Sequence, residues 1–172
     1  LIVGAGMSGI CIAAKLREAG ILFTILDKNA AVGGTWYENT YPDCGVDTPN
    51  HYYSYSFNRN PTWSGYFSKR DELFSYFDDH ADQFDLREHI RFNTEVQEAR
   101  FNSKTNLWDV QINSKDGASV ETVNVVVSAV GQLNRPSLPD IPNLATFTGP
   151  TFHSAEWRSD IDLADKKVAV IG

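Results

Sequence analysis

The sequence predicts an α/β fold in which a parallel sheet is accompanied by an antiparallel β-meander. The short apolar run at residues 1–3 leads into a glycine-rich turn, and a helical pattern and a second apolar run follow. Residues 90–127 contain short alternating runs separated by turn residues, which is typical of antiparallel strands. Residues 123–130 are almost continuously apolar, as in a strand that is buried on both faces of a parallel sheet.

The glycine turn follows the spacing G-x-G-x-x-G, with Gly4, Gly6 and Gly9 at the three positions. The first glycine allows a tight turn after the strand, and the second lets a pyrophosphate approach the bare backbone. The third glycine lets the following helix pack closely against the sheet. The helix is expected to run to about Ala19, with Gly20 as its stop, and its N-terminus would direct free N–H groups toward a phosphate.

The second predicted strand, residues 21–26, ends at Asp27. An acid at about 20 residues beyond the glycines can accept hydrogen bonds from both ribose hydroxyls of an adenosine, and it repels a 2′-phosphate. The pattern therefore predicts a Rossmann-like domain that binds FAD or NAD and rejects NADP. A glycine turn that binds nothing is the alternative, and the register of strand, helix and acid counts against it.

Composition and charge narrow the class of protein. A chain of 172 residues with 42% hydrophobic and 22% charged residues is typical of a soluble globular domain. The net charge of −7 argues against nucleic acid or an anionic membrane as the main partner. No apolar stretch reaches the ~18 residues that a membrane span needs. Cys11 and Cys44 form neither a disulfide framework nor a metal set, so we expect no structural metal and a reducing, cytoplasmic compartment.

A long ordered loop is expected over residues 30–60, and such loops tend to carry function. The paired glycines Gly33 and Gly34 would let a second piece of backbone approach the same ligand. For the aromatic residues Tyr55 and Phe57, packing against the sheet is preferred to ligand contact. Residues 68–84 show the apolar spacing of a helix.

The second half of the chain contains the meander, a connector and a last apolar run. The run at residues 123–130 ends at Gly131, at the carboxyl edge of the sheet, where ligands of such folds lie. Residues 132–142 contain three prolines and no periodicity, which favours a stiff connector. The end of the chain repeats the pattern of an apolar strand that ends on glycine. The expected antiparallel strands are residues 90–96, 98–101, 108–112 and 120–127.

Three motifs resemble those of Baeyer-Villiger monooxygenases, in the class B flavin-dependent group, and together they span essentially the whole chain. The first is the glycine fingerprint with its acid, followed by a glycine pair in the spacing acid-x5-G-G. The second is the loop pattern G-G-x-W-x4-Y-P-x4-D over residues 33–47. The third is the linker fingerprint F-x-G-x3-H-x3-W, which is met by Phe147, Gly149, His153 and Trp157. Related enzymes that oxidise nitrogen or sulfur usually carry Tyr or Phe in place of this tryptophan.

The resemblance implies an FAD- and NADPH-dependent monooxygenase that inserts one oxygen atom of O2 into ketones to give esters or lactones. The alternatives are an N- or S-oxygenating flavin monooxygenase, a nucleotide-binding module that is inactive in isolation, and an NAD-dependent dehydrogenase. By the resemblance, FAD contacts would come from Gly4, Gly6, Ser8, Gly9, Asp27, Gly34, Thr35, Trp36 and Gly131, with Asp47 beside the flavin and with Tyr53 and the backbone near Val96 as weaker candidates.

Asp47 is the candidate catalytic residue, because the matching aspartate of the family lies beside the flavin and the nicotinamide. An Asx-turn cap in a polar loop is the alternative for this residue. The histidine that matches His153 belongs to the interdomain linker and organises domain movement, whereas a merely packed or surface histidine is the alternative. Trp157 either takes part in the same domain movement or simply anchors the linker.

Three parts are expected along the chain. Residues 1–131 form an FAD-binding domain, which we interpret as incomplete relative to the parent protein. Residues 132–165 form an interdomain linker that carries the third motif. Residues 166–172 form the first strand of a truncated NADP-binding domain, and the isolated fragment is expected to be inactive.

Overall fold

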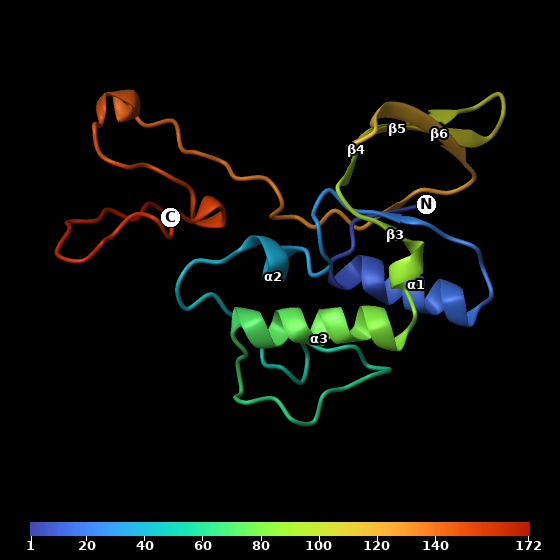
Figure 1. Cartoon of the computed structure of the whole chain (residues 1–172), viewed down its shortest axis with the longest axis horizontal. Helices are drawn as coiled ribbons and strands as arrows, with labels where there is room; N and C mark the ends of the chain where they lie inside the picture. Colours follow the sequence, from blue (N-terminus) through green and yellow to red (C-terminus); the bar gives the residue numbers. More distant parts are fainter.

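The computed structural model describes residues 1–172 as a layered body followed by an extended C-terminal arm (Figure 1). In the body, α-helices cover one face of a central sheet and a second sheet lies beyond its other face. The elements in chain order are β1 (Ile2–Val3), α1 (Met7–Glu18), β2 (Ile25–Leu26), α2 (Thr35–Glu38), α3 (Arg70–Gln83), η1 (Arg87–His89), β3 (Ile90–Arg91), β4 (Thr94–Asn102), β5 (Leu107–Ser114), β6 (Gly117–Val123), β7 (Val127–Ser128), η2 (Leu144–Thr146) and η3 (Ser154–Glu156).

The central sheet is parallel, with the strand order β3-β2-β1-β7. Helix α1 connects β1 to β2, as in a β-α-β unit. The three-stranded sheet β4-β5-β6 is antiparallel. The predicted α/β class, with a parallel sheet and an antiparallel meander, is therefore confirmed.

Alternation along β2 explains how the central sheet joins the other layers. Ile25 is fully buried in the cluster that contains Ile10 and Phe77 of the helices. The next residue, Leu26, is buried in a separate cluster with Val110 and Ile112 of the meander. Because successive strand side chains point to opposite faces, these two residues hold a helical layer and a second sheet on either side. Full burial of each contributes about 1.5–3 kcal/mol.

The predicted strand 90–96 is divided in the structure. Asn93 adopts a left-handed backbone conformation with φ of 51°, which interrupts the strand. The part before it, β3, pairs in parallel with β2, and the part after it, β4, opens the meander. Assigning the whole run to the meander was therefore wrong, since an asparagine that accepts positive φ redirects the chain from one sheet to the other.

Three apolar runs form less strand than predicted. In the run 21–26, Ile21 and Leu22 are exposed and only β2 pairs. In the run 123–130, Val125 and Val130 are exposed, and only the two residues of β7 pair, at the edge of the sheet. Val126 and Val127 pack against the clusters on opposite sides of the sheet but are only half-buried, so the expected burial on both faces is partial. Residues 168–172 form no strand, since no neighbouring strand supplies hydrogen-bonding partners.

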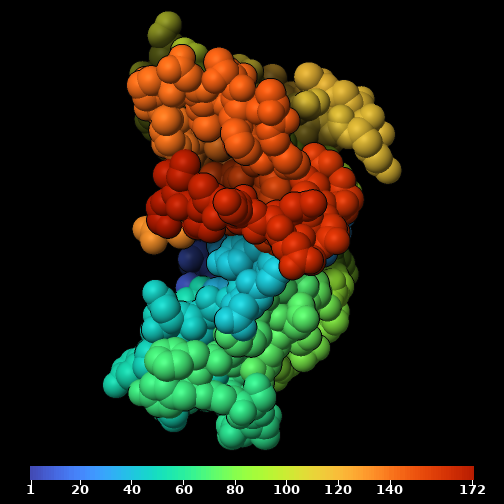
Figure 2. Space-filling view, turned by 90° about the vertical axis from the view of Figure 1, so that its left-hand side faces the viewer, coloured from blue at the N-terminus to red at the C-terminus, as the bar shows by residue number.

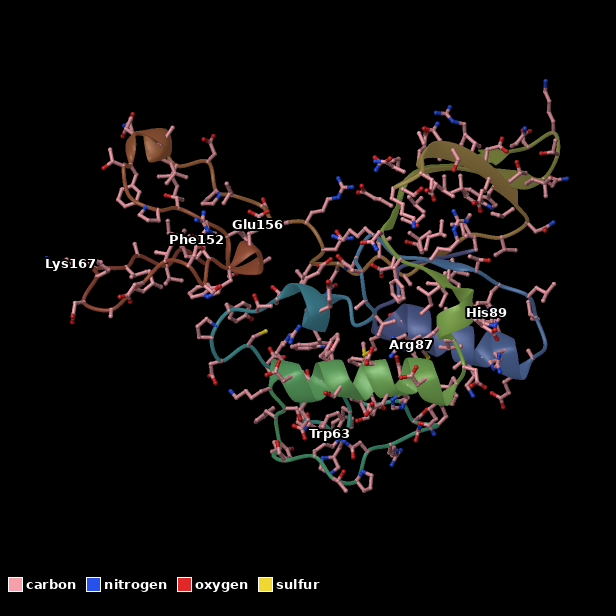
Figure 3. The ribbon with its side chains drawn as sticks, viewed as in Figure 1. Trp63, Arg87, His89, Phe152, Glu156 and Lys167 are labelled. Atoms are coloured by element: carbon pink, nitrogen blue, oxygen red, sulfur yellow. The ribbon has the colours of Figure 1, made fainter.

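The C-terminal arm runs away from the body, and its backbone hydrogen bonds from residue 141 onward are local turns. Phe152, Glu156 and Lys167 lie on this arm, whereas Arg87 and His89 lie at the opposite side of the body (Figure 3). Viewed from the arm's side, the arm forms the upper surface, and α3 with the loop before it forms the lower one (Figure 2). None of the helices has the length and apolar composition that crossing a lipid bilayer requires.

Candidate functional site

The glycine turn joins β1 to α1 and leaves no room for a side chain at two of its positions. Gly4 has φ of 102°, and a Cβ atom there would lie 2.6 Å from the carbonyl oxygen of Ala129. A Cβ atom at Gly9 would collide with the carbonyl oxygen of Gly4. The helix closes its first hydrogen bond from Ile10 N to the Gly6 oxygen at 3.0 Å. The N–H groups of the preceding turn, with the exposed Ser8 among them, are therefore free to meet an anion.

A second glycine pair lies directly against this turn. The Gly33 N–H donates to the carbonyl oxygen of Ala5 at 3.0 Å. A Cβ atom at Gly34, which has φ of 53°, would lie 3.0 Å from the Gly6 Cα. Gly34 also precedes α2, whose first residue is the exposed Thr35. Two segments of bare backbone and two helix starts thus face each other, although the four-residue α2 is too short to bind an anion by its own dipole.

Asp27 lies at the end of β2 with only 5% of its surface exposed. Its Oδ2 accepts the N–H of Ala5 at 2.6 Å, and its Oδ1 accepts the N–H of Asn29 at 2.8 Å. Burial raises the pKa of this carboxyl above its ordinary value, although both amide bonds oppose the rise. Each carboxylate oxygen has a further lone pair, so the group can still accept two hydroxyl donors.

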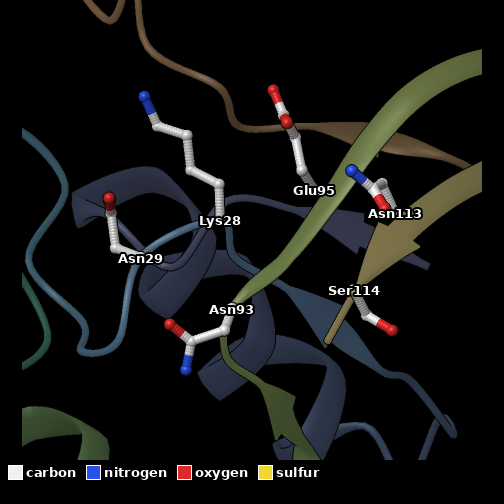
Figure 4. A pocket seen from close by; sticks show the side chains of 6 residues that line it. All are labelled: Lys28, Asn29, Asn93, Glu95, Asn113 and Ser114. Carbon is white, nitrogen blue, oxygen red and sulfur yellow. The ribbon is translucent and has the colours of Figure 1, made fainter. Parts of the chain in front are cut away.

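A polar cavity of about 390 Å³ lies beside Asp27 at the carboxyl edge of the central sheet (Figure 4). Predicted residue Val96 is next to this cavity, but its side chain packs into the Leu26 cluster, so only its backbone can reach a ligand. The ladder shifts register between Val96 and Glu98, and such a bulge leaves a residue outside the regular pairing. The lining residues are Lys28, Asn29, Asn93, Glu95, Asn113 and Ser114.

The long loop brings three predicted residues together. The indole Nε1 of Trp36 donates to the hydroxyl oxygen of Tyr53 at 3.1 Å, and the two rings meet edge to face at 5.7 Å. Burial raises the pKa of Tyr53, and the nearby charge of Asp47 adds to the rise. Because Tyr53 accepts from Trp36, its own proton remains available for another acceptor. Asp47 itself is exposed, and its carboxylate accepts the hydroxyl of Thr48 at 3.4 Å.

The remaining predicted residues lie outside these groups. Gly131 is exposed just beyond β7 at the carboxyl edge of the sheet. In the arm, the ring of Phe147 lies against Gly149, where a Cβ atom would be 2.6 Å from it. His153 Nδ1 accepts the N–H of Ala155 at 3.0 Å and so caps η3, and Trp157 meets Phe152 edge to face at 5.4 Å. The contacts of the linker motif are thus local to the arm.

Sequence reasoning missed a polar network behind Asp27. Glu38 Oε1 accepts from Asn29 Nδ2 at 2.9 Å and pairs with Lys28 Nζ at 2.9 Å. The Lys28 ammonium also donates to the carbonyl oxygen of Asn134 at 3.4 Å. Lys28 and Asn29 could have been found because they follow Asp27 directly. Glu38 and Asn134 come from distant positions, and no local pattern connects them.

The geometry fits an elongated ligand with a central diphosphate. Amide donors lie at the α1 N-terminus, and a buried acceptor carboxylate lies at the end of the next strand. A polar cavity is lined by the two residues that follow this carboxylate, Lys28 and Asn29. An aromatic pair with a nearby carboxylate lies along the loop. No group of three or more His, Cys, Asp or Glu side chains could hold a metal ion. The polar groups of the site are those of a dinucleotide site.

Comparisons with known proteins point in the same direction. Residues 2–70 match the family model of the NAD(P)-binding Rossmann-like domain. Residues 53–172 match the family model of L-lysine 6-monooxygenase/L-ornithine 5-monooxygenase.

Individual relatives extend over nearly the whole chain. A Baeyer-Villiger monooxygenase of Streptomyces coelicolor is 42% identical over 172 residues, which cover 99% of this chain and 32% of that protein. The crystal structure of cyclohexanone monooxygenase from Rhodococcus bound to NADP+ is 40% identical, with a TM-score of 0.82, and the match covers 94% of this chain and 31% of that one. A structure of OTEMO in complex with FAD and NADP is 35% identical, with a TM-score of 0.81, over 93% of this chain and 30% of that one. The chain spans about a third of the length of these relatives.

Proposed function

The chain belongs to the L-lysine 6-monooxygenase/L-ornithine 5-monooxygenase family, and from its similarity to proteins named Baeyer-Villiger monooxygenase we propose that it is the FAD-binding part of a ketone-oxygenating enzyme. The reaction consumes a ketone, O2, NADPH and a proton, and it yields an ester or lactone, NADP+ and water. Bound FAD supplies the redox chemistry, since it accepts electrons from NADPH and delivers them to O2.

The observation that carries the FAD proposal is the contact between the two glycine segments. The diphosphate of any dinucleotide needs one stretch of bare backbone at the start of the helix. The flavin half of FAD, which would lie along the loop, needs a second stretch. Gly6 and Gly34 supply these two backbones face to face. An NAD-dependent dehydrogenase has no use for the second one, so this contact favours the flavin.

Each group of residues has a definite task in this proposal. The N–H groups of the α1 N-terminus, near Gly6 and Ser8, bind the diphosphate. The Asp27 carboxylate accepts the ribose hydroxyls, and the backbone near Val96 and the polar cavity receive the adenine end. Trp36 and Tyr53 form a wall for the flavin ring, with Thr35, Gly131 and Gly4 and Gly9 shaping the surrounding backbone.

Asp47 is assigned to the reaction itself, beside the flavin and the nicotinamide. Its exposed carboxylate is free to position a basic group or the nicotinamide amide of NADPH. The linker motif with His153 and Trp157 is assigned to the movement between the FAD-binding part, residues 1–131, and an NADP-binding domain that opens at residues 166–172. Cys11 and Cys44 are free thiols, which suits the reducing, cytoplasmic compartment that we also propose.

The assay uses the full-length protein with NADPH and O2. We expect cyclohexanone or another ketone to stimulate NADPH consumption, with ester or lactone formed in equal amount. The match to the lysine and ornithine monooxygenase model favours one other candidate, the oxygenation of amines. Turnover of lysine, ornithine or sulfides without any ketone oxidation would contradict the ketone proposal. A yellow protein that NADPH does not bleach would instead be a binding module.

A further inference from the structure

Tyr55 connects the long loop to the start of helix α1. Its side chain is 5% exposed, and its hydroxyl donates to the carbonyl oxygen of Met7 at 2.6 Å. Met7 is the first residue of α1 and directly follows Gly6. The bond therefore fixes the turn whose N–H groups face the proposed diphosphate.

Further contacts of its backbone and ring hold Tyr55 in place. Its backbone N–H donates to the hydroxyl oxygen of Tyr76 on α3 at 2.9 Å. Its ring stacks on Phe57 at 5.1 Å with an interplanar angle of 8°, and it meets Phe77 and His80 edge to face. Burial raises the pKa of Tyr55, so the phenol keeps its proton and remains a donor. The side chain is therefore held rigidly, unlike that of a surface tyrosine.

The same short segment also reaches the second glycine region. Tyr53, two residues earlier, accepts the indole N–H of Trp36 on α2. Residues 53–55 thus touch both helices that begin at the facing glycines Gly6 and Gly34. A shift of the α1 start by about 0.5 Å would misplace several N–H donors of the proposed diphosphate site together, so the contacts that hold this start matter for binding.

We propose that Tyr55 is a positioning residue for the dinucleotide: its hydrogen bond to the Met7 carbonyl sets the diphosphate-binding turn of α1. The inference rests on the proposed function, since it presumes that FAD binds at this turn. It assigns to Tyr55 a role beyond the packing that its burial alone indicates.

The test is a titration of the full-length apoprotein with FAD and ADP by calorimetry. Tyr55→Phe keeps the ring and removes only the hydroxyl, so we expect the Kd for FAD and for ADP to rise about three- to tenfold. Adenosine, which lacks the diphosphate, should bind the variant as it binds the wild type. Ser68→Ala is the control, because it removes a buried hydroxyl that bonds Asn50 of the same loop and has no hydrogen bond to Tyr55 or α1. Its Kd for ADP should stay within a factor of two.

The outcomes separate the two claims. Unchanged binding of FAD and ADP by Tyr55→Phe overturns the positioning role and leaves the proposed function standing. An equal rise in Kd for Tyr55→Phe and Ser68→Ala, with equal losses of melting temperature, also overturns it, because general loosening of the loop then explains both. A wild-type protein that binds no FAD overturns the proposed function and this inference together.

Discussion

At the scale of single residues, Asp27 is the most constrained group of the site. A carboxylate with 5% exposure carries a large desolvation cost, and two amide bonds offset only part of it, as its raised pKa indicates. Proteins keep such a group where its acceptor strength is needed. The sequence allowed Asp27 to be identified from its spacing, whereas its burial and its bond to Ala5 depend on the tertiary fold.

The variant Asp27→Asn tests whether the titration of this carboxyl makes the unfolding free energy depend on pH. Since the folded pKa lies above the ordinary value of 3.8, folding favours the protonated acid. Its stabilisation is present at and below that value and is lost as pH rises through the folded pKa. We expect the unfolding free energy of the wild type, relative to Asp27→Asn, to fall as the pH rises above the ordinary value of 3.8. Urea unfolding at several pH values measures this difference, and a pH-independent difference would contradict the account.

Asp47 provides a contrasting case, because its side chain is exposed and its hydrogen bond to Thr48 is long. Asp47→Ala should change stability by less than about 0.5 kcal/mol. FAD affinity should change less than about threefold, whereas ketone-dependent turnover should fall at least about tenfold. Steady-state kinetics beside an FAD titration separate these effects. Equal turnover by the variant would restrict Asp47 to the Asx-turn cap.

At the scale of elements, the site depends on the close packing of the start of α1 against the glycine turn that precedes it. The sequence predicted this unit because glycine spacing reports directly on backbone space, and it predicted the helix at residues 68–84 within two residues of α3. It failed at the short strands. Two-residue strands such as β2 and β7 are defined by partners, not by their own pattern, and the division at Asn93 depends on one backbone conformation.

Gly9→Ala and Gly6→Ala separate packing from binding in this unit. A methyl group at Gly9 meets the Gly4 carbonyl oxygen, so we expect a loss of about 1–3 kcal/mol of stability. At Gly6 the nearest atom to a new Cβ is 3.4 Å away, and the backbone is in the extended region, so stability should be nearly unchanged. Since the second glycine of the fingerprint lets the diphosphate approach bare backbone, the same methyl group should weaken FAD binding at least about tenfold.

Thermal unfolding and FAD titration of both variants provide the measurement. A Gly6→Ala variant that binds FAD like the wild type would show that the diphosphate does not approach the Gly6 backbone. A Gly9→Ala variant as stable as the wild type would show that α1 does not depend on this close packing.

At the scale of the whole molecule, a compact body and an exposed arm are joined near Gly131. Residues 135–140 are all exposed, and few hydrogen bonds, such as that of Lys28 to Asn134, tie the connector to the body. The prolines made the connector predictable. The polar cavity beside Asp27 was not predictable, because its residues come from the segments that follow β2 and β3 and from β4 and β5, and they meet only after folding.

Limited proteolysis tests this division. Subtilisin should cut first within residues 132–142 and leave a resistant fragment close to residues 1–131, because exposed, sparsely bonded backbone is cleaved first. Mass spectrometry of the early products identifies the cuts. First cuts within the loop at residues 40–66 would show that the loop is less firmly held than its hydrogen bonds to α1, α2 and α3 indicate.

The proposed function requires FAD to lie with its diphosphate at the α1 N-terminus and its ribose at Asp27. A crystal structure of the protein with FAD tests it most directly. We expect both ribose hydroxyls of the adenosine within about 3.2 Å of the Asp27 carboxylate oxygens and the diphosphate against the backbone N–H groups of the α1 N-terminus. FAD bound elsewhere, or an adenosine ribose that does not contact Asp27, would contradict it.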